Sequence, residues 1–168
     1  MWLVIEPPQD VATPGGARRL LTDPIDRRIA TALLADGRST LKSLAEVTGL
    51  SVSAVQARVR RLEADGVIRG YTALLDAESI GLPLAALIAI TPLDPGQPDD
   101  APERLADLPQ IEACHSVAGD DAYVLFVRVA SPSALEQLIR DIRMRANVST
   151  RTTVVLQTFF ERRMGPTD

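Results

Sequence analysis

The sequence is poor in the residues that form disulfides and metal sites. It has one cysteine, Cys114, and one histidine, His115, in 168 residues. A single cysteine excludes an intrachain disulfide and fits a reducing compartment. Neighbours on a strand point to opposite faces, so these two side chains cannot form a Cys–His pair or share a metal. The sequence therefore predicts no metal site.

Convergent carboxylates and a phosphate-binding loop are also missing. The acidic pairs Asp99-Asp100 and Asp120-Asp121 fall in expected loops, not in the paired arrangement that acid–base catalysis needs. No glycine-rich loop ends in the lysine of a nucleotide-binding motif. We therefore expect no catalytic residue, no enzyme and no cofactor.

Long apolar runs are absent as well. The longest, Leu82–Ile90, is far shorter than the roughly 20 residues that span a bilayer as a helix. Residues 2–5 are apolar, but no basic segment precedes them, so we predict no signal peptide and no membrane partner. We expect a cytoplasmic protein with a flexible N-terminal arm at 1–17, rich in proline and glycine, and a short tail at 164–168.

Charge is unevenly distributed along the chain. Residues 18–75 hold ten Lys or Arg and six Asp or Glu, a net charge of +4, whereas residues 76–168 hold eight and fourteen, a net charge of −6. The overall charge of −4 therefore conceals a basic front part. Phosphates respond to the local field, so this asymmetry predicts two units with different partners, the first suited to nucleic acid.

Three helices are expected in residues 18–66. Asp23-Pro24 begins the first, as an N-cap followed by proline at the first helical position. The second runs from about Leu41 to Val47, with Leu41, Leu44, Ala45 and Val47 facing inward. Thr48-Gly49-Leu50-Ser51 then supplies a tight turn and the cap of a third helix. A short helix, a glycine turn and a basic-faced helix predict a helix-turn-helix, although any three-helix bundle shares part of this pattern.

The third helix, 51–65, has two contrasting faces. Val55, Val59 and Leu62 form an apolar stripe, and small residues and arginines occupy the remaining surface. Small side chains permit close approach to a DNA groove, while Arg60 and Arg61 can reach guanine edges and Arg58 and Lys42 can reach phosphates. Arg69, in the next segment, fits a phosphate contact or a solvated strand charge equally well. The candidate DNA-binding residues are Thr40, Lys42, Ser51, Ser53, Ala54, Gln56, Ala57, Arg58, Arg60, Arg61 and Arg69.

The second half predicts a ferredoxin-like βαββαβ sandwich, which makes the whole chain α+β. Residues 67–82 form an extended linking strand or hinge, and residues 83–163 form the sandwich, ending in a strand at 150–161. Leu84–Ile90 and Val124–Val129 are apolar at nearly every position, so both sheet faces should be covered. Helices can cover one face and a second subunit the other, which predicts a homodimer.

The chain resembles the Lrp/AsnC family of transcription regulators, also called feast/famine regulatory proteins. The resemblance lies in Asp-Pro-Ile-Asp-Arg-Arg-Ile at 23–29, Asp-Gly-Arg at 36–38, Leu-Ala-Glu-Val-Thr-Gly-Leu-Ser at 44–51, and the long run at 58–76. It implies a sequence-specific regulator that binds double-stranded DNA, dimerises through its C-terminal sheet and often assembles into octamers. It also implies a small-molecule effector, usually an amino acid, bound between C-terminal domains.

The hairpin at 119–121 implies part of that effector site. Relatives carry Gly-x-x-Asp there, whereas this chain has Gly119-Asp120-Asp121-Ala122, so alanine replaces the aspartate and Asp121 stands one place early. Without the family, the stretch reads as a polar hairpin turn, and threonines on the last strand are also ordinary strand residues. The effector-binding candidates are Gly119, Asp120, Asp121, Ala122, Tyr123, Thr150, Thr152 and Thr153.

One function of another class remains open from the residues. The N-terminal helices could dock a protein partner while the C-terminal half senses a small molecule and oligomerises. This alternative predicts effector binding without salt-dependent affinity for DNA.

Overall fold

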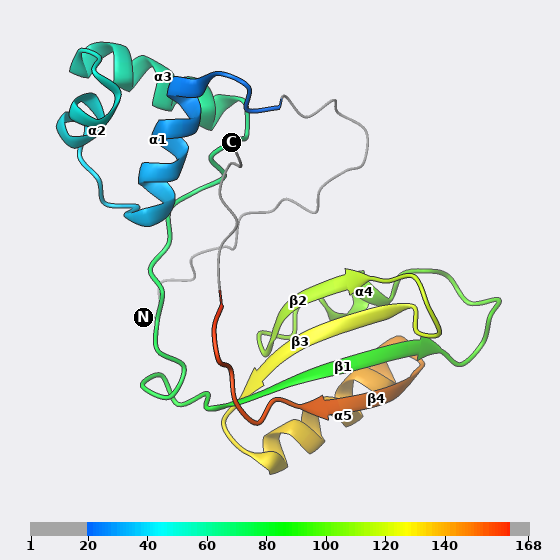
Figure 1. Cartoon of the computed structure of the whole chain (residues 1–168). Helices are drawn as coiled ribbons and strands as arrows, with labels where there is room; N and C mark the ends of the chain where they lie inside the picture. Colours follow the sequence, from blue (N-terminus) through cyan, green and yellow to red (C-terminus); the bar gives the residue numbers. More distant parts are fainter. Residues whose placement is uncertain (1–19, 162–168) are drawn as a thin grey trace. The chain divides into compact units, whose positions relative to one another are not determined.

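In the computed structural model, residues 20–161 are described. The expected arm at 1–17 and tail at 164–168 lie outside them. The described chain divides into two compact units, and the boundary along the chain falls between Ala73 and Leu74 (Figure 1). Each unit has its own hydrophobic core.

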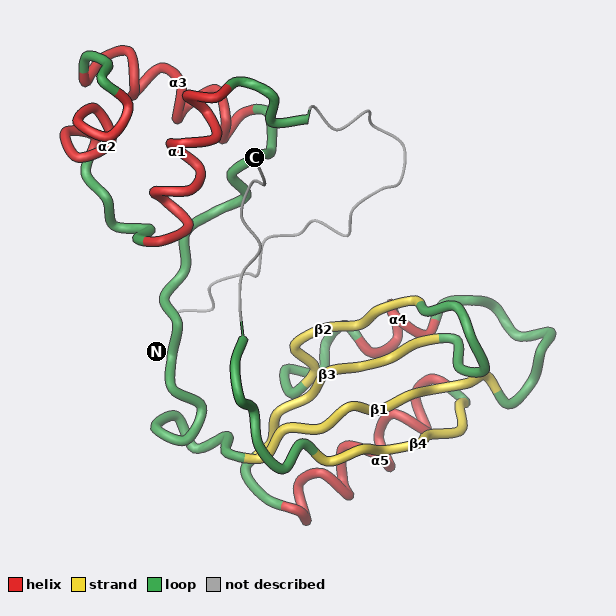
Figure 2. The backbone as a smooth tube through the Cα atoms, in the orientation of Figure 1, coloured by secondary structure: helices red, strands yellow, loops and turns green. Residues whose placement is uncertain are grey.

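The N-terminal unit contains three helices, as expected. They are α1 (Pro24–Ala35), α2 (Leu41–Thr48) and α3 (Val52–Ala64) (Figure 2). The side chains of Asp23, Thr40 and Ser51 each accept a hydrogen bond from a backbone N–H in the first turn of the helix that follows. These bonds satisfy donors that have no partner inside a helix, which explains why each helix begins where it does.

The core of this unit is built from one face of each helix. Ile29, Leu44 and Val55 are almost wholly enclosed. The expectation that Val47 points inward is wrong, because Val47 is 55% exposed and Thr48 is buried instead. At about 100° per residue, Thr48 follows Leu44 on the same face and Val47 falls outside it. The Thr48 hydroxyl donates to the Leu44 carbonyl, which satisfies the buried oxygen.

Residues 67–82 form no strand within the single chain. They run as an irregular segment with turns between Ala77 and Gly81 (Figure 2). The expected linking strand is therefore absent here, because an extended segment forms a strand only when a neighbour accepts and donates its backbone hydrogen bonds. The Tyr71 hydroxyl nevertheless ties this segment to α3 by donating to Glu63 at 2.9 Å.

The C-terminal unit has the predicted β-α-β-β-α-β order. Its elements are β1 (Leu84–Pro92), α4 (Ala101–Leu105), β2 (Ile111–Ser116), β3 (Tyr123–Val129), α5 (Pro132–Ala146) and β4 (Val148–Val154). The strands lie in the order β2-β3-β1-β4 and all pairs are antiparallel. Both helices lie on one face of the sheet (Figures 1 and 2). This is the ferredoxin-like sandwich, and the fold is α+β as expected.

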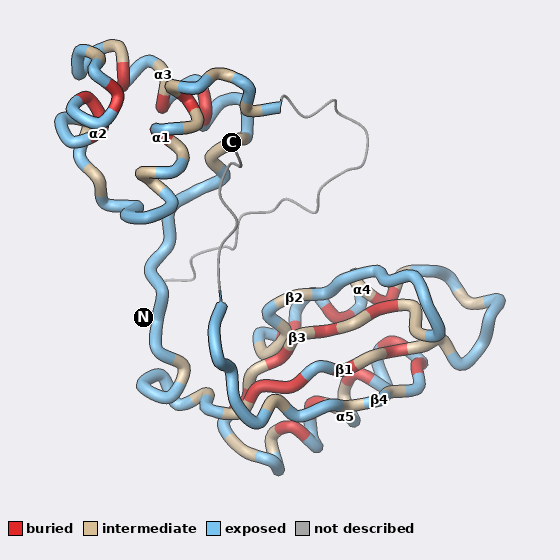
Figure 3. The backbone as a smooth tube through the Cα atoms, viewed as in Figure 1, coloured by how far each residue is buried: buried red, intermediate tan, exposed pale blue. Residues whose placement is uncertain are grey.

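The core of this unit lies between the sheet and the two helices. Ile88 and Ile90 of β1 and Leu125 of β3 are fully enclosed against Leu105 of α4 and Ile142 of α5. Buried and half-buried positions alternate along β3, as the colours in Figure 3 show. The sheet face under the helices, which we call the helix face, is filled within one chain. The opposite face, the open face, carries no helix.

The last strand begins and ends earlier than expected. Asn147, with φ +52°, turns the chain sharply after α5, so that β4 starts directly at Val148. Regular pairing stops at Val154, which pairs with Ala86, and one further bond runs from the Val155 N–H to the Ala85 carbonyl at 2.9 Å. Among residues 20–161, no helix is long and apolar enough to cross a membrane.

Candidate nucleic-acid interface and ligand site

The exposed face of α3 is the first candidate site. Val55, Val59 and Leu62 are buried against α1 and α2, which turns the opposite face of the helix to solvent. That exposed face carries four polar or small side chains, defined here as the reading face: Ser53, Gln56, Ala57 and Arg60. The Arg60 guanidinium has no hydrogen-bond or ion-pair partner within residues 20–161. Its five donors are therefore available to an external acceptor.

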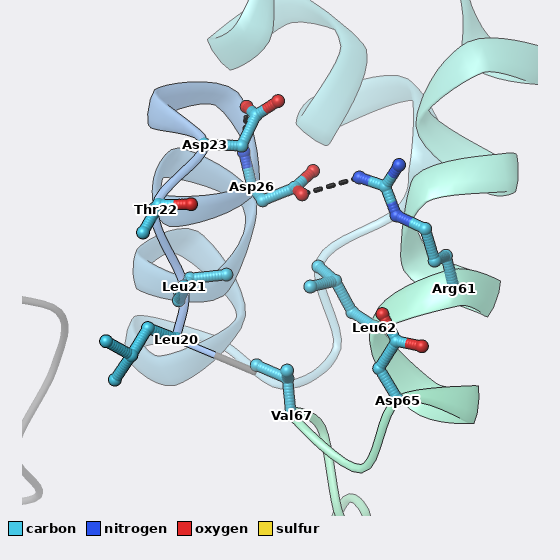
Figure 4. A pocket seen from close by; sticks show the side chains of 9 residues that line it. All are labelled: Leu20, Leu21, Thr22, Asp23, Asp26, Arg61, Leu62, Asp65 and Val67. Atoms are coloured by element: carbon cyan, nitrogen blue, oxygen red, sulfur yellow. Dashed lines mark hydrogen bonds and ion pairs between the residues drawn. The ribbon is translucent and has the colours of Figure 1, made fainter. Parts of the chain in front are cut away.

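The structure turns two other arginines of α3 in a different direction. Arg58 Nη1 lies 3.0 Å from Asp23 Oδ2 and 2.7 Å from Asp26 Oδ1. Arg61 Nη2 lies 2.6 Å from Asp26 Oδ2, the pair marked in Figure 4. Sequence analysis assigned Arg61 to base edges and Arg58 to phosphates. In the folded domain, both instead bind carboxylates of the first turn of α1.

These ion pairs also alter the electrostatics of the domain. The hydrogen bond from Arg58 is the main cause that holds the pKa of Asp23 below its ordinary value, and hydrogen bonds to Asp26 and Asp23 raise the pKa of Arg58. Asp23 and Arg58 are therefore both charged near neutral pH. Because the charges of Arg58 and Arg61 are partly neutralised inside the domain, the positive field outside it comes more from other cations. Arg60, Lys42 and Arg69 are exposed cations of this unit.

Two hydroxyls among the DNA-binding candidates have capping roles. Thr40 Oγ1 accepts from the Ser43 N–H, and Ser51 Oγ accepts from the Ala54 N–H at 3.3 Å. Ala54 itself is half-buried. These residues lie at the starts of α2 and α3, where free backbone N–H groups favour anions.

A shallow hollow lies beside the ion pairs, between the start of α1 and the end of α3. Figure 4 shows Leu20, Leu21 and Val67 around it, with Asp26 and Arg61 on its wall. Sequence analysis did not single out this hollow.

The second candidate site is the connection between β2 and β3. Its ends are held by the Val117 N–H, which donates to the Ala122 carbonyl, and by the Ala122 N–H, which donates to the Ile90 carbonyl. Gly119 has φ +152°, a conformation that other residues adopt with strain, and a Cβ there would meet nothing within 4 Å. Gly119 and Asp120 are exposed. The turn is thus accessible from outside the unit.

The Asp121 carboxylate turns toward the end of the sheet. It accepts from Thr91 Oγ1 at 3.3 Å and forms an ion pair with Arg151. Thr91 of β1 and Arg151 of β4 both lie on the open face of the sheet. Sequence analysis missed both partners, because cross-strand pairing cannot be read without the register. The opposite charges of Asp121 and Arg151 were the one feature of the sequence that could have indicated this ion pair.

Three of the other effector candidates, Tyr123, Thr150 and Thr152, face away from Asp121. The Tyr123 hydroxyl donates to Asp99, and the Tyr123 ring is 7% exposed within the helix-face core. Thr150 and Thr152 pair with Ile90 and Ile88, so they also lie on the helix face. Arg143 of α5 donates to Thr150 Oγ1 at 2.8 Å, which agrees with that placement.

Only Thr153 among the three threonines lies on the open face. It pairs with Leu87. Thr150 and Thr152 therefore lie on the opposite sheet face from Thr153, because consecutive strand positions alternate between faces.

The open face of the sheet is apolar at its centre. Leu87 pairs with Phe126, and Ala89 pairs with Val124. Leu87 is 40% exposed although it lies on a central strand. Arg128 covers part of this face, with its guanidinium carbon 5.3 Å from the Phe126 ring centre.

A helix-turn-helix with a free arginine on its third helix, followed by a ferredoxin-like unit with an accessible hairpin, defines a class. That class is the two-domain DNA-binding regulator with a ligand-binding domain. Comparison with family models agrees. The model described as "Winged helix-turn-helix DNA-binding" matches residues 22–69, and the model described as "Lrp/AsnC ligand binding domain" matches residues 85–164.

Individual relatives agree with the family models. The HTH-type transcriptional regulator LrpA of Mycobacterium tuberculosis is 57% identical over 141 residues, which are 84% of this chain and 94% of that protein. The leucine-responsive regulatory protein of Escherichia coli is 39% identical over 140 residues, which are 80% and 85% of the two chains. The chain belongs to the Lrp/AsnC family of transcription regulators.

Solved structures show the same fold. A feast or famine regulatory protein from M. tuberculosis, complexed with L-methionine, has a TM-score of 0.84 at 56% identity and is similar over 86% of this chain and 99% of its own. The chain is accordingly a DNA-binding transcription regulator with a ligand-binding domain. The alternative in which the helices dock a protein partner loses its support.

Proposed function

We propose that this chain binds a specific DNA operator through the reading face of α3, as a homodimer, and that an amino acid modulates this binding or the oligomeric state. The observation that carries the proposal is the free guanidinium of Arg60 on the exposed face of a helix-turn-helix. An arginine there can donate two hydrogen bonds to one guanine. The proposal includes no catalytic step.

Each residue of the reading face suits a different contact with DNA. Arg60 suits guanine, Gln56 suits adenine, and Ser53 and Ala57 let the helix backbone approach the groove. Lys42 and Arg69 provide phosphate contacts, and Thr40, Ser51 and Ala54 lie at helix starts near the same backbone. Arg58 and Arg61 are left out of this footprint because they are engaged with α1.

An amino acid is the proposed effector class. The related M. tuberculosis protein was solved with L-methionine, and so was a regulator from Neisseria meningitidis that is 27% identical. In this chain, Asp121 can accept from an ammonium group, and the exposed backbone at Gly119 and Asp120 can donate to a carboxylate. Arg151 occupies Asp121 in the free chain, so an effector ammonium would compete with it.

The open face is the proposed dimer interface. An exposed Leu87 beside Phe126 on a central strand favours a second copy that removes this surface from water. Two copies related by a twofold axis present two α3 helices to one duplex. We also propose that these dimers assemble into octamers, as the family resemblance implies.

Binding to selected DNA tests this function. A duplex is first selected from a random pool by the purified wild-type protein, and affinity is measured over a salt series with and without each amino acid. We expect steep salt dependence and a shift in affinity with at least one amino acid. Arg60→Gln should lose about 10-fold or more in affinity for the selected duplex, equivalent to about 1–3 kcal/mol, and relax the sequence preference at the base pair that Arg60 reads.

Arg28→Gln is the matched control, because Arg28 is an exposed arginine on α1 away from the reading face. It should change affinity far less than Arg60→Gln. A protein that selects no sequence, or that binds with no salt dependence, would contradict the proposed function.

A further inference from the structure

Two acidic and two basic residues in the N-terminal unit have the same spacing. Asp23 and Asp26 are three residues apart at the start of α1, and Arg58 and Arg61 are three residues apart on α3. Residues three apart on a helix lie on one face, one turn from each other. The two pairs therefore form complementary charged edges where α1 meets α3.

Asp26 is the centre of this cluster. Its side chain is 7% exposed, and its two oxygens accept from different arginines at 2.7 and 2.6 Å. Arg58 is 26% exposed and also reaches Asp23, which in turn caps α1 through the Ile25 N–H. One buried carboxylate thus connects the first turn of α1 to two successive turns of α3.

The same geometry makes these arginines poor DNA contacts. If Arg61 or Arg58 swung outward to a phosphate, Asp26 would keep its charge in a buried position with fewer partners. A buried charge that loses its partner is strongly destabilising. We therefore expect the guanidinium groups to stay with α1 when DNA is present.

Their position relative to the reading face gives them another role. At 100° per residue, Arg58 and Arg61 lie on the flank of α3 between the buried stripe and the reading face. Apolar packing by Val55, Val59 and Leu62 is non-directional, whereas paired hydrogen bonds to a planar guanidinium are directional. The ion pairs can therefore fix the rotation of α3 more tightly than packing alone.

We propose that Asp26 is a positioning residue which, through Arg58 and Arg61, fixes the rotation of α3 and thereby sets the sequence specificity of the reading face, while neither arginine contacts DNA. This inference rests on the proposed reading face. It adds to that proposal a residue on α1, outside the helix-turn-helix pair α2–α3, that determines which sequence is read.

The substitution Asp26→Asn is expected to change DNA affinity in opposite directions through its charge and through a loss of positioning. The substitution removes a negative charge next to two arginines, so electrostatics alone would strengthen binding to every duplex. Loss of positioning would instead weaken binding to the correct sequence only. Loss of positioning therefore lowers the ratio of affinities for selected and scrambled DNA, whereas electrostatics alone raises both affinities together.

The experiment compares five full-length proteins: wild type, Asp26→Asn, Arg61→Gln, the double variant Asp26→Asn/Arg61→Gln, and Glu46→Gln. Glu46 lies exposed on α2 with no ion pair to any residue of 20–161, so Glu46→Gln matches the charge change of Asp26→Asn. Affinity is measured over a salt series for the duplex selected by the wild type and for a scrambled duplex of the same composition. Thermal unfolding confirms that each variant is folded.

We expect Asp26→Asn to lower the selected-to-scrambled affinity ratio at least 10-fold, with affinity for scrambled DNA unchanged or higher. Arg61→Gln should lower the same ratio without lowering the salt slope, and the double variant should lose little more than either single variant. Arg61 is 44% exposed and its loss leaves the Arg58 pair intact, so this variant tests the inference even if Asp26→Asn does not fold.

The opposite pattern would overturn the inference. If Arg61→Gln weakened binding to both duplexes and lowered the salt slope by about one, Arg61 would be a phosphate contact. An Asp26→Asn protein that behaves like Glu46→Gln would show that the carboxylate affects only the field. A wild-type protein that prefers no sequence would instead defeat the proposed function, which is a separate result.

Discussion

Tyr123, a candidate effector contact from the sequence, lies in the core of the C-terminal unit. The hairpin pattern placed it beside an effector, but its hydroxyl donates to Asp99 and its ring lies in the helix-face core. The hydrogen bond to the Asp99 carboxylate is the main cause that raises the pKa of Tyr123 to about 12. The residue is therefore a buried structural contact between β3 and the loop before α4.

Tyr123→Phe is expected to lower the free energy of unfolding by about 1 kcal/mol near neutral pH, because it removes one buried hydrogen bond. The folded pKa of Tyr123 lies above its unfolded value of 10. The stabilisation is therefore complete below about pH 10 and is lost as the pH rises through about 12.

Chemical denaturation of both proteins from pH 7 to pH 12 measures this difference. The gap in stability between wild type and Tyr123→Phe should narrow only above pH 10. A gap that stays constant to pH 12 would show that the hydroxyl does not titrate as proposed.

The sequence predicts the positions of the arginines on α3 but not their partners. Their helical positions were predictable, and Arg60 lies exposed as its spacing indicates. The partners of Arg58 and Arg61 were not, because Asp23 and Asp26 are more than 30 residues away along the chain. Complementary i, i+3 spacing was visible in the sequence, yet only the packing of α1 against α3 shows that the pairs meet.

At the scale of elements, the turn between α2 and α3 depends on one glycine. Gly49 ends α2 with φ +72°, and its N–H donates to the Ala45 carbonyl. A Cβ at Gly49 would meet nothing within 4 Å, so the requirement for glycine is one of backbone conformation rather than space. The turn sets how α3 leaves α2 and therefore how the reading face is presented.

Gly49→Ala should destabilise the N-terminal unit by about 1–2 kcal/mol, since residues with a Cβ pay that amount in the left-handed region. Gly37→Ala is the matched control, because Gly37 has no positive φ and a Cβ there would make only ordinary contacts at 3.8 and 3.9 Å. Thermal unfolding followed by circular dichroism compares the two. Equal losses of stability would refute the role of the turn geometry.

The sequence predicts where helices start better than where strands begin and end. Caps such as Asp23 and Ser51 placed helix starts well, because the capping bond forms between residues three apart. The end of β4 and the absence of a strand at 67–82 depend on which neighbour is available. Hydrogen-bond partners of a strand are set by the sheet, not by the strand's own composition.

At the scale of the whole molecule, the open face is the feature that one chain leaves incomplete. Leu87 and Phe126 lie at the centre of a sheet whose other face is fully packed. A stable dimer needs roughly 800 Å² buried on each partner. A four-stranded sheet face is large enough to supply that area.

Leu87→Lys should convert a dimer into a monomer at micromolar concentration, because a buried lysine without a partner is costly. Met144→Lys is the control, since Met144 is exposed on α5, on the opposite layer. Sedimentation velocity distinguishes the two states. A dimer that survives Leu87→Lys would place the interface elsewhere.

The sequence by itself determined the helices and their caps, the order of the strands, the apolar stripes and the family. These features depend on contacts within a few residues or on patterns along one element, so the order of residues carries them directly. Only the tertiary structure decided that Arg58 and Arg61 turn toward Asp26, that Thr150 and Thr153 lie on different faces, and that Tyr123 reaches Asp99. Those outcomes depend on strand register and helix packing, which bring together side chains separated by many residues in the chain.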